Sequence, residues 1–358
     1  MSRRRLSRRK AGLSPIRRLA IVGMSAVVTA AVVLGLVLAW ALWTFYGPGP
    51  AARQGDETIV MLRRGAGVRE IASALESSGV IGSSSLFTAA AQVTGAAGEL
   101  KAGEYRIASH ASLRQVLEDV RNGRVIRRFV TIPEGVTSET AVAILNANPV
   151  LEGVVSAPPE GSVLPETYQV ERGDDRAVVL KRMMDAQETL LAQLWAKRQA
   201  GLPFDTPEEA VTLASIVEKE TGIASERPRV AAVFVNRLRR GMRLESDPTI
   251  IYGLTRGRPL GRGIRASELA SATPYNTYLI DGLPPTPIAN PGRASLAAVL
   301  DPPRTEELFF VADGSGGHVF AKTFEEHTRN VAKWRAVEKA KAAQASAAAA
   351  PIAKGAAQ

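Results

Sequence analysis

The sequence contains no cysteine, which excludes disulfide bonds and thiolate metal sites, so the fold must rest on its own core. Aromatic residues make up only 5% of the 358 residues, and there are three histidines. His110, His318 and His327 show no close ligand spacing, and no H-E-x-x-H motif occurs. We therefore expect no metal site and no cofactor. The absence of cysteine fits any compartment, including an oxidising one.

Negative charge is missing from the N-terminus, where positive charge is concentrated. The formal net charge is +10, and residues 1–18 carry eight Arg or Lys and no acid. The tail from Ala336 adds three lysines against one glutamate, which leaves the residues between these ends without net charge. Nucleic-acid grooves combine clustered cations with stacking aromatics in the body of the protein. We therefore expect no nucleic-acid partner.

Residues 19–46 contain no charge at all. A membrane-spanning helix needs roughly 20 apolar residues, and Trp40, Trp43 and Tyr46 lie at the far end, as aromatics do at a membrane interface. A cleaved signal peptide is the alternative, but its apolar region is about 7–15 residues long and a small-x-small cleavage site should follow. We expect an uncleaved single-pass anchor at 19–46, with the basic segment 1–18 in the cytoplasm and the body across the membrane.

Glycine, proline and composition divide the rest of the chain. We expect an α+β fold with a linker at 47–56, an α+β subdomain at 57–130, a mainly helical domain at 131–335 and a poorly ordered low-complexity tail at 336–358. A strand, a glycine turn and an amphipathic helix recur near residues 58, 103 and 126, which suggests a weak internal repeat. Such units resemble LysM modules, which bind glycan chains, and an ordinary α+β subdomain stays open as the alternative. The motif "GSGG" predicts a C-terminal β-hairpin.

The stretch "FDTPEEAVTLASIVEKETG" has a strong helix start. Thr206 can cap, Pro207 fits the first turn, Glu209 completes a capping box, and Gly222 is the expected stop. At about 100° per residue, Glu220 falls about 20° from Leu213, inside an apolar stripe. Glu218 falls about 140° away, beyond the edge of that stripe, so we expect it to make surface contacts or to hold the fold.

A carboxyl group in an apolar stripe needs either a partner or a proton. Burial and the negative end of the helix dipole both raise its pKa, and a neutral carboxylic acid suits general acid catalysis of glycoside cleavage. The alternative is that Glu220 forms a core salt bridge with Arg237 or Arg243. The helical wheel alone leaves both readings open.

Four stretches of the sequence, one of them inside the helix just described, carry a resemblance to a known family. The motifs "ASIVEKET", "VFVNRLRRGMRLESDPTIIYG", "TPYNTYLIDGLPP" and "FFVADGSGGHVFAKTFEEH" resemble the endolytic murein transglycosylase (YceG-like) family, over residues 57–335. The resemblance implies a bacterial inner-membrane protein with a periplasmic LysM-like part and a periplasmic catalytic domain. Such a protein cleaves peptidoglycan glycan strands internally between MurNAc and GlcNAc, leaves 1,6-anhydro ends, and has peptidoglycan synthases as partners.

The family's catalytic glutamate maps to Glu220, the residue that the wheel also selects. Tyr and Asn in the neighbouring loops suit sugar binding through ring stacking and hydrogen bonds, although each is also an ordinary turn residue. The candidate substrate-binding residues are Glu166, Tyr168, Asn236, Asp247, Tyr252, Tyr275, Asn276 and Tyr278.

The chain departs from the family pattern at a few positions. Leu164 and Glu166 replace the usual phenylalanine and aspartate in "LPETY", Glu245 replaces glutamine, and Thr286 replaces a common glycine. Two other functions stay open. One is a hydrolytic muramidase with Glu166 or Asp247 as second carboxylate, and the other is a glycan-binding scaffold without activity.

Overall fold

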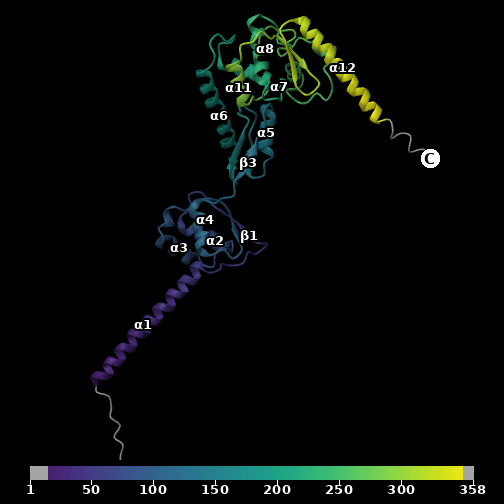
Figure 1. The fold of residues 1–358 in the computed structure, drawn as a ribbon. Coiled ribbons are helices and arrows are strands. Elements are labelled where there is room, and N and C mark those ends of the chain that lie inside the picture. The colour runs from purple at the N-terminus through teal and green to yellow at the C-terminus, as the bar shows by residue number, and fades with distance from the viewer. Residues whose placement is uncertain (1–14, 350–358) are drawn as a thin grey trace, which may run out of the picture. The chain divides into compact units, whose positions relative to one another are not determined.

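The computed structural model describes residues 15–349 and mixes helices with short strands (Figure 1). It divides into two compact units between Arg127 and Arg128, three residues before the boundary expected from the sequence. The first fourteen residues of the basic segment and the last nine of the tail lie outside the described residues.

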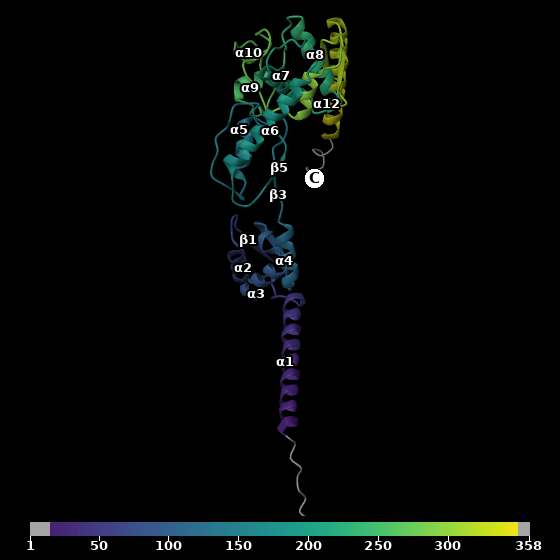
Figure 2. The same cartoon turned by 90° about the vertical axis from the view of Figure 1, so that its left-hand side faces the viewer.

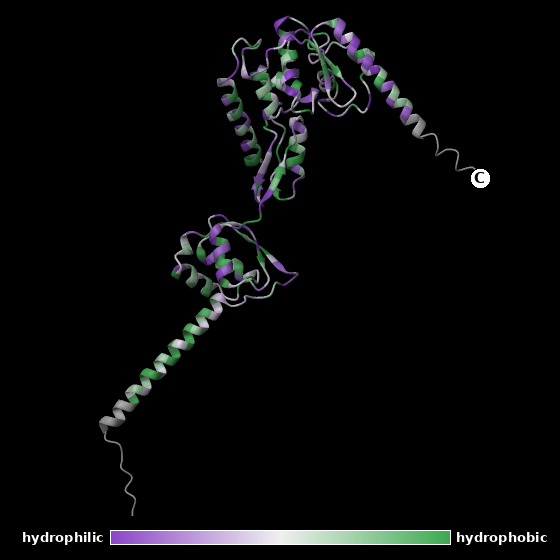
Figure 3. Ribbon diagram, viewed as in Figure 1, coloured by the Kyte–Doolittle hydropathy of each residue, from purple (hydrophilic) through white to green (hydrophobic). Residues whose placement is uncertain are grey.

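The first unit opens with the long helix α1 (Pro15–Tyr46). Its residues Val22–Tyr46 are apolar and long enough to cross a membrane, and Figure 3 shows this hydrophobic character along the helix. The end of α1 belongs to the folded unit, because Phe45 packs against its core and the Arg114 guanidinium lies 5.5 Å from the Tyr46 ring centre. The other elements are β1 (Glu57–Leu62), α2 (Val68–Ser77), α3 (Ser84–Val93), the 3-10 turn η1 (Ala96–Gly98), β2 (Gly103–Ala108) and α4 (Leu113–Asn122).

The expected linker at 47–56 is fastened to the first unit. The Gly49 amide donates to the His110 carbonyl (3.1 Å), the His110 amide donates to the Pro50 carbonyl (3.0 Å), and the Ala52 amide donates to the Ser109 hydroxyl (3.0 Å). A Cβ at Gly49 would lie 2.1 Å from the Ala111 carbonyl oxygen, so only glycine fits this close approach.

The two strands of the first unit belong to one sheet. β1 pairs antiparallel with β2 and the helices cover it, with Tyr105 fully buried at the centre. The segment near residue 126 leads instead into β3 (Arg128–Thr131), which pairs with β5 (Thr167–Val170) in the second unit. The expected recurrence of strand, turn and helix is confirmed, because helices begin at Val68, Leu113 and Ser138 shortly after β1, β2 and β3. The third of these units lies in the second compact unit and pairs there with β5.

The second unit is mainly helical beyond residue 176, as expected. Its remaining elements are α5 (Ser138–Ala147), β4 (Leu151–Glu152), β6 (Asp174–Asp175), α6 (Arg176–Ala196), α7 (Pro207–Glu220), α8 (Arg227–Arg239), α9 (Asp247–Thr255), α10 (Ala266–Leu269), α11 (Arg293–Leu300), β7 (Phe309–Ala312), β8 (His318–Ala321) and α12 (Phe324–Ala349). Helix α7 lies among α6, α8, α9 and α11 (Figure 2), and β7 pairs antiparallel with β8.

The low-complexity tail is partly helical. We expected poor order from Ala336 onward, but α12 continues to Ala349. Alanine and lysine are strong helix formers, and they outweigh the low complexity of the sequence.

Candidate active site

Helix α7 positions the two carboxylates of the "EKET" motif. It begins as expected, with Pro207 in the first turn and a reciprocal capping box between Thr206 and Glu209. It ends at Glu220 with the extended Thr221 (φ −140°) as C-cap, so the helix stops directly before Gly222, as expected, although Gly222 lacks the left-handed backbone of a typical C-terminal glycine. Every residue from 210 to 217 is buried, including the polar residues Thr212 and Ser215. The helix therefore has no solvent face there, and periodicity alone cannot separate its two glutamates.

Glu218 is held by a cation and a backbone amide. Its side chain is 4% exposed, and its carboxylate lies 3.0 Å from the Arg227 guanidinium. The Gly292 amide at the start of α11 donates to its other oxygen (2.9 Å). The expected surface contact is thus wrong, and the expected role in holding the fold agrees with these bonds.

Glu220 has a hydroxyl partner instead. The Ser246 hydroxyl donates to Glu220 Oε1 over 2.5 Å. The two arginines considered as salt-bridge partners are bound elsewhere, since Arg237 pairs with Glu245 (3.1 Å) and Arg243 pairs with Asp281 (3.2 Å). Burial raises the pKa of Glu220 to about 7, and the Ser246 hydrogen bond opposes this rise. A proton is therefore available on Glu220 at neutral pH.

Ser246 is fixed through its backbone. Its amide donates to Thr277 Oγ1 (2.9 Å), and its carbonyl accepts from Thr249 Oγ1 (2.7 Å). These three residues are at most 1% exposed. The preceding Glu245 has a left-handed backbone (φ 52°), which is unfavourable for a residue with a Cβ, and its amide donates to the Thr277 carbonyl. The turn is thus strained and tightly bound next to Glu220.

Asp247 and Tyr278, two predicted binding residues, form a pair beside this turn. The Tyr278 hydroxyl donates to Asp247 Oδ1 (2.8 Å). Burial and this hydrogen bond raise the pKa of Tyr278 well above its usual range. The negative charge of Asp247 also raises the pKa of Glu220, although less than burial does. The structure therefore brings Glu220, Asp247 and Tyr278 together.

A second pair, the Glu226 carboxylate and the His318 imidazole, borders the same helix end. Glu226 accepts from the backbone amide of His318 (2.8 Å), and its Oε2 lies 2.7 Å from His318 Nδ1. The Thr221 hydroxyl, in the residue directly after Glu220, also donates to Glu226 Oε2 (3.3 Å). The positive character of His318 lowers the pKa of Glu220 and partly offsets the effect of burial.

Tyr252 and Tyr275 form a separate aromatic pair. Their ring centres lie 5.0 Å apart in an edge-to-face arrangement, with the Arg256 guanidinium 5.7 and 5.5 Å from the two rings. Tyr252 donates to Glu160 Oε2 (3.3 Å), and the Tyr275 hydroxyl lies 2.7 Å from that of Thr286. Their hydroxyl groups thus already have protein partners.

The two predicted asparagines hold backbone segments. Asn236 donates its amide hydrogens to the carbonyls of Thr305 (2.9 Å) and Glu307 (3.0 Å). Asn276 donates to the carbonyls of Leu269 (2.9 Å) and Ser271 (2.8 Å). These bonds position loops.

Tyr168 belongs to the β3–β5 sheet, and Glu166 directly precedes β5. Tyr168 pairs with Val130 across the strands, and its hydroxyl donates to the Leu164 carbonyl (2.8 Å). The Glu166 side chain is exposed, and its carbonyl accepts from the Ile132 amide (3.0 Å). The contacts of this pair are local to the sheet.

Sequence reasoning missed Ser246, Thr249, Thr277, Glu226 and His318. The only local signal was "SDPT", which is typical of a helix N-cap. Ser246 does occupy the N-cap of α9, but its side chain makes no capping bond. Its contact with Glu220 joins residues 26 positions apart, which no local pattern encodes.

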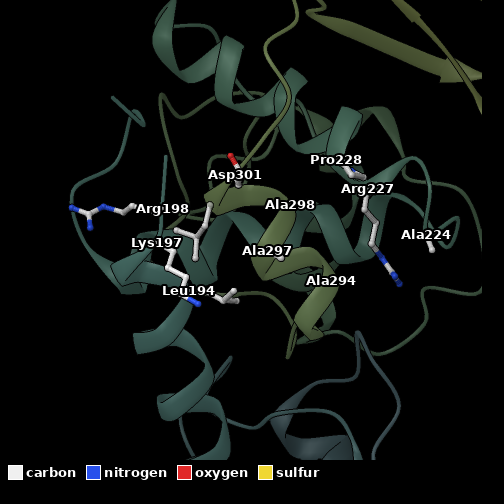
Figure 4. Close-up of a pocket in the computed structure, with 11 residues that line it drawn as sticks. Leu194, Lys197, Arg198, Ala224, Arg227, Pro228, Ala294, Ala297, Ala298 and Asp301 are labelled. Carbon is white, nitrogen blue, oxygen red and sulfur yellow. The ribbon is translucent and has the colours of Figure 1, made fainter. Parts of the chain in front are cut away.

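A pocket elsewhere in the second unit is shown in Figure 4. Lys197, Arg227, Pro228, Ala297 and Asp301 are among its lining residues, so it borders the cation that holds Glu218 and does not include Glu220. Within residues 15–349, no group of three or more His, Asp or Glu is arranged to hold a metal ion.

Comparisons with known proteins cover most of the chain. A family model described as "YceG-like family" matches residues 60–333. A Bacillus subtilis (strain 168) protein named endolytic murein transglycosylase is 28% identical over 318 residues, which cover 80% of this chain and 87% of that protein. Proteins of the same name from two Streptococcus pneumoniae strains, D39 and R6, are 27% identical over 324 residues, covering 76% of this chain. The matched region spans only 58% of the length of these two proteins. A crystal structure of a yceG-like protein from Listeria monocytogenes is 26% identical, with a TM-score of 0.49, and covers 76% of this chain and 98% of that chain.

Proposed function

The chain belongs to the YceG-like family, and we propose that it is an endolytic murein transglycosylase whose acid–base group is Glu220. The observation that carries the proposal is the contrast inside "EKET". Glu218 is neutralised by Arg227, whereas Glu220 meets a neutral hydroxyl and has a pKa raised by burial to about 7. A general acid works best with a pKa near the operating pH, so Glu220 is the carboxyl suited to proton transfer.

The first step breaks the glycosidic bond between MurNAc and GlcNAc. Protonated Glu220 donates its proton to the bridging oxygen, and the bond from MurNAc C1 to that oxygen breaks as positive charge develops at C1. The leaving GlcNAc departs with a free 4-hydroxyl group. The negative charge of Asp247 close to Glu220 favours this positive centre as well as the protonated form of the acid.

The second step closes the 1,6-anhydro ring. Glu220, now ionised, accepts the proton of the 6-hydroxyl of the same MurNAc as O6 bonds to C1. This returns the proton to Glu220 and consumes no water. The substrate supplies the nucleophile, so this mechanism does not need the second carboxylate of hydrolytic glycosidases.

Four of the predicted residues fit substrate contact in this mechanism. Tyr278 holds Asp247 beside the acid, and the Tyr252–Tyr275 pair offers aromatic surface of the kind that packs on sugar rings. Asn236 and Asn276 support loops of the same unit. Glu166 and Tyr168 remain candidates for contact with a more distant part of the glycan.

We further propose that the first unit binds glycan as LysM-like modules do. The order β1–α2–α3–β2, with both strands in one antiparallel sheet, supports this reading. The eight cations before an apolar helix support a single-pass inner-membrane anchor with both units in the periplasm. There the enzyme would trim or terminate nascent glycan strands beside peptidoglycan synthases of elongation or division.

Product analysis tests the proposal. We expect full-length protein in detergent, incubated with purified sacculi, to release muropeptides that carry 1,6-anhydroMurNAc, identified by mass spectrometry. Reducing MurNAc ends would instead identify a muramidase, for which Asp247, whose charge acts on Glu220, is a candidate second carboxylate. Binding without any new ends would identify a scaffold.

A further inference from the structure

Ser246 has the sequence position of a helix cap but does not act as one. A serine at an N-cap normally accepts a hydrogen bond from the backbone amide two or three residues later. At the start of α9 this bond is absent, and the hydroxyl points instead to Glu220 Oε1 at 2.5 Å. The residue is 1% exposed, so the hydroxyl does not exchange this partner for bulk water.

The direction of this hydrogen bond follows from the surroundings of Ser246. Among residues 15–349, Glu220 Oε1 is the one hydrogen-bond partner of Ser246 Oγ. A serine that accepted from the acid would leave its own buried proton without an acceptor, at a cost of about 1–3 kcal/mol. The serine therefore donates, and Oε1 acts as the acceptor oxygen.

We propose that Ser246 is a positioning residue, which reserves Glu220 Oε1 as acceptor and so places the transferable proton on Oε2. This inference rests on the proposed function, because it assigns a role within the same proton transfer. The backbone of Ser246 is held by Thr277 and Thr249, so the hydroxyl has a fixed position from which to select one carboxyl oxygen. With the proton on Oε2, Glu220 donates from one defined oxygen in one direction, which suits proton transfer to a single glycosidic oxygen.

The test compares kcat, KM and pH dependence of full-length variants on soluble uncrosslinked glycan strands. We expect Ser246→Ala to lower kcat about 10- to 100-fold with little change in KM, since misplacement of a reacting group has effects of this size. Loss of a donor to the ionised carboxylate also raises the pKa of Glu220, so the decline of kcat at high pH should move to higher pH. Ser246→Thr keeps the hydroxyl and should restore most of the rate and the original pH profile.

Ser295→Ala is the matched control. Ser295 is fully buried in α11, and its hydroxyl has no hydrogen-bond partner within the part of the chain that the structure describes, so its loss should change neither kcat nor the pH profile. Should Ser246→Ala fail to fold, Ser246→Cys decides, because a thiol is a weak donor and must shift the profile in the same direction.

Glu220→Gln distinguishes a failure of the positioning role of Ser246 from a failure of the proposed function. If Glu220→Gln is inactive while Ser246→Ala keeps the kcat and pH profile of the wild type, the positioning role is wrong and the proposed function stands. A purely structural role, with lower thermal stability but unchanged pH profile, also overturns the inference. If Glu220→Gln retains activity, the proposed function itself is wrong.

Discussion

The Glu218 carboxylate lies 3.0 Å from the Arg227 guanidinium, whereas Glu220, the last residue of the same helix, accepts a hydrogen bond from the Ser246 hydroxyl. Two carboxylates in one turn thus have opposite surroundings. The first pairs with Arg227 and so joins α7 to the start of α8. The second has a hydroxyl as its hydrogen-bond partner, and burial raises its pKa to about 7.

Glu218→Gln should lower stability more than activity. The amide keeps an acceptor for the Gly292 amide but loses the charge pair with Arg227, which retains Glu134 at 3.0 Å. We expect the free energy of unfolding to fall by about 1–3 kcal/mol, measured by denaturant unfolding of the full chain in detergent.

Glu325→Gln is the control for this change. Glu325 pairs with Arg329 on the surface of α12 and is 82% exposed, so its loss should cost less than about 1 kcal/mol. Equal losses in the free energy of unfolding would show that the Glu218–Arg227 pair stabilises the fold no more than an exposed ion pair does.

The stability of Glu220→Gln relative to wild type should depend on pH. The folded protein holds the Glu220 proton with a pKa of about 7, against 4.5 for the usual carboxyl, so wild-type stability decreases as pH rises from 4.5 to 7. The full effect is about 1.4 kcal/mol per pKa unit, and solvent at the partly exposed side chain reduces it. Glutamine does not titrate, so the Tm of the variant should rise relative to wild type across this interval. A difference that stays constant with pH, as for Ser295→Ala, would contradict a raised pKa.

Asp247→Asn should move the pH profile of activity to lower pH. The charge of Asp247 raises the pKa of Glu220, and asparagine removes that charge while its Oδ1 still accepts from Tyr278. The decline of kcat on the basic side should therefore begin at a lower pH than in wild type. Asp281→Asn is the matched control, since Asp281 is 82% exposed and pairs with Arg243. Identical profiles for Asp247→Asn and wild type would exclude this electrostatic role.

Local sequence signals predicted the elements that carry the site. The start of α7 followed from Thr206, Pro207 and Glu209, whose hydrogen bonds lie within one turn. The wheel selected Glu220 because it assumed one apolar face. In the structure α7 is buried on all sides from residue 210 to 217, so the difference between the two glutamates comes from their partners, Arg227 and Ser246.

Those partners could not be predicted, because the contacts that make the site are distant in sequence. Ser246 and Thr277 are 31 residues apart, and Glu226 and His318 are 92 residues apart. Each of these residues stands at an ordinary local position, at a helix start, in a turn or in a hairpin. Only the packing of loops at the end of α7 brings them together.

The orientation in the membrane can be tested with single cysteines, because the chain has none of its own. We expect Val154→Cys, at an 87% exposed position of the second unit, to react with a membrane-impermeant maleimide once the outer membrane is opened. Ser7→Cys, in the basic segment, should react only after lysis. The reverse pattern would place the catalytic unit in the cytoplasm and exclude access to peptidoglycan.

The decisive experiment is mass spectrometry of the glycan ends that wild type and Glu220→Gln create from sacculi in oxygen-18 water. We expect wild type to form 1,6-anhydroMurNAc ends without the heavy isotope, since the 6-hydroxyl of the substrate is the nucleophile. Loss of the acid–base group should reduce these ends about 10²- to 10⁴-fold in Glu220→Gln. Ends that carry oxygen-18, or anhydro ends formed by Glu220→Gln at the wild-type rate, would contradict non-hydrolytic cleavage by Glu220.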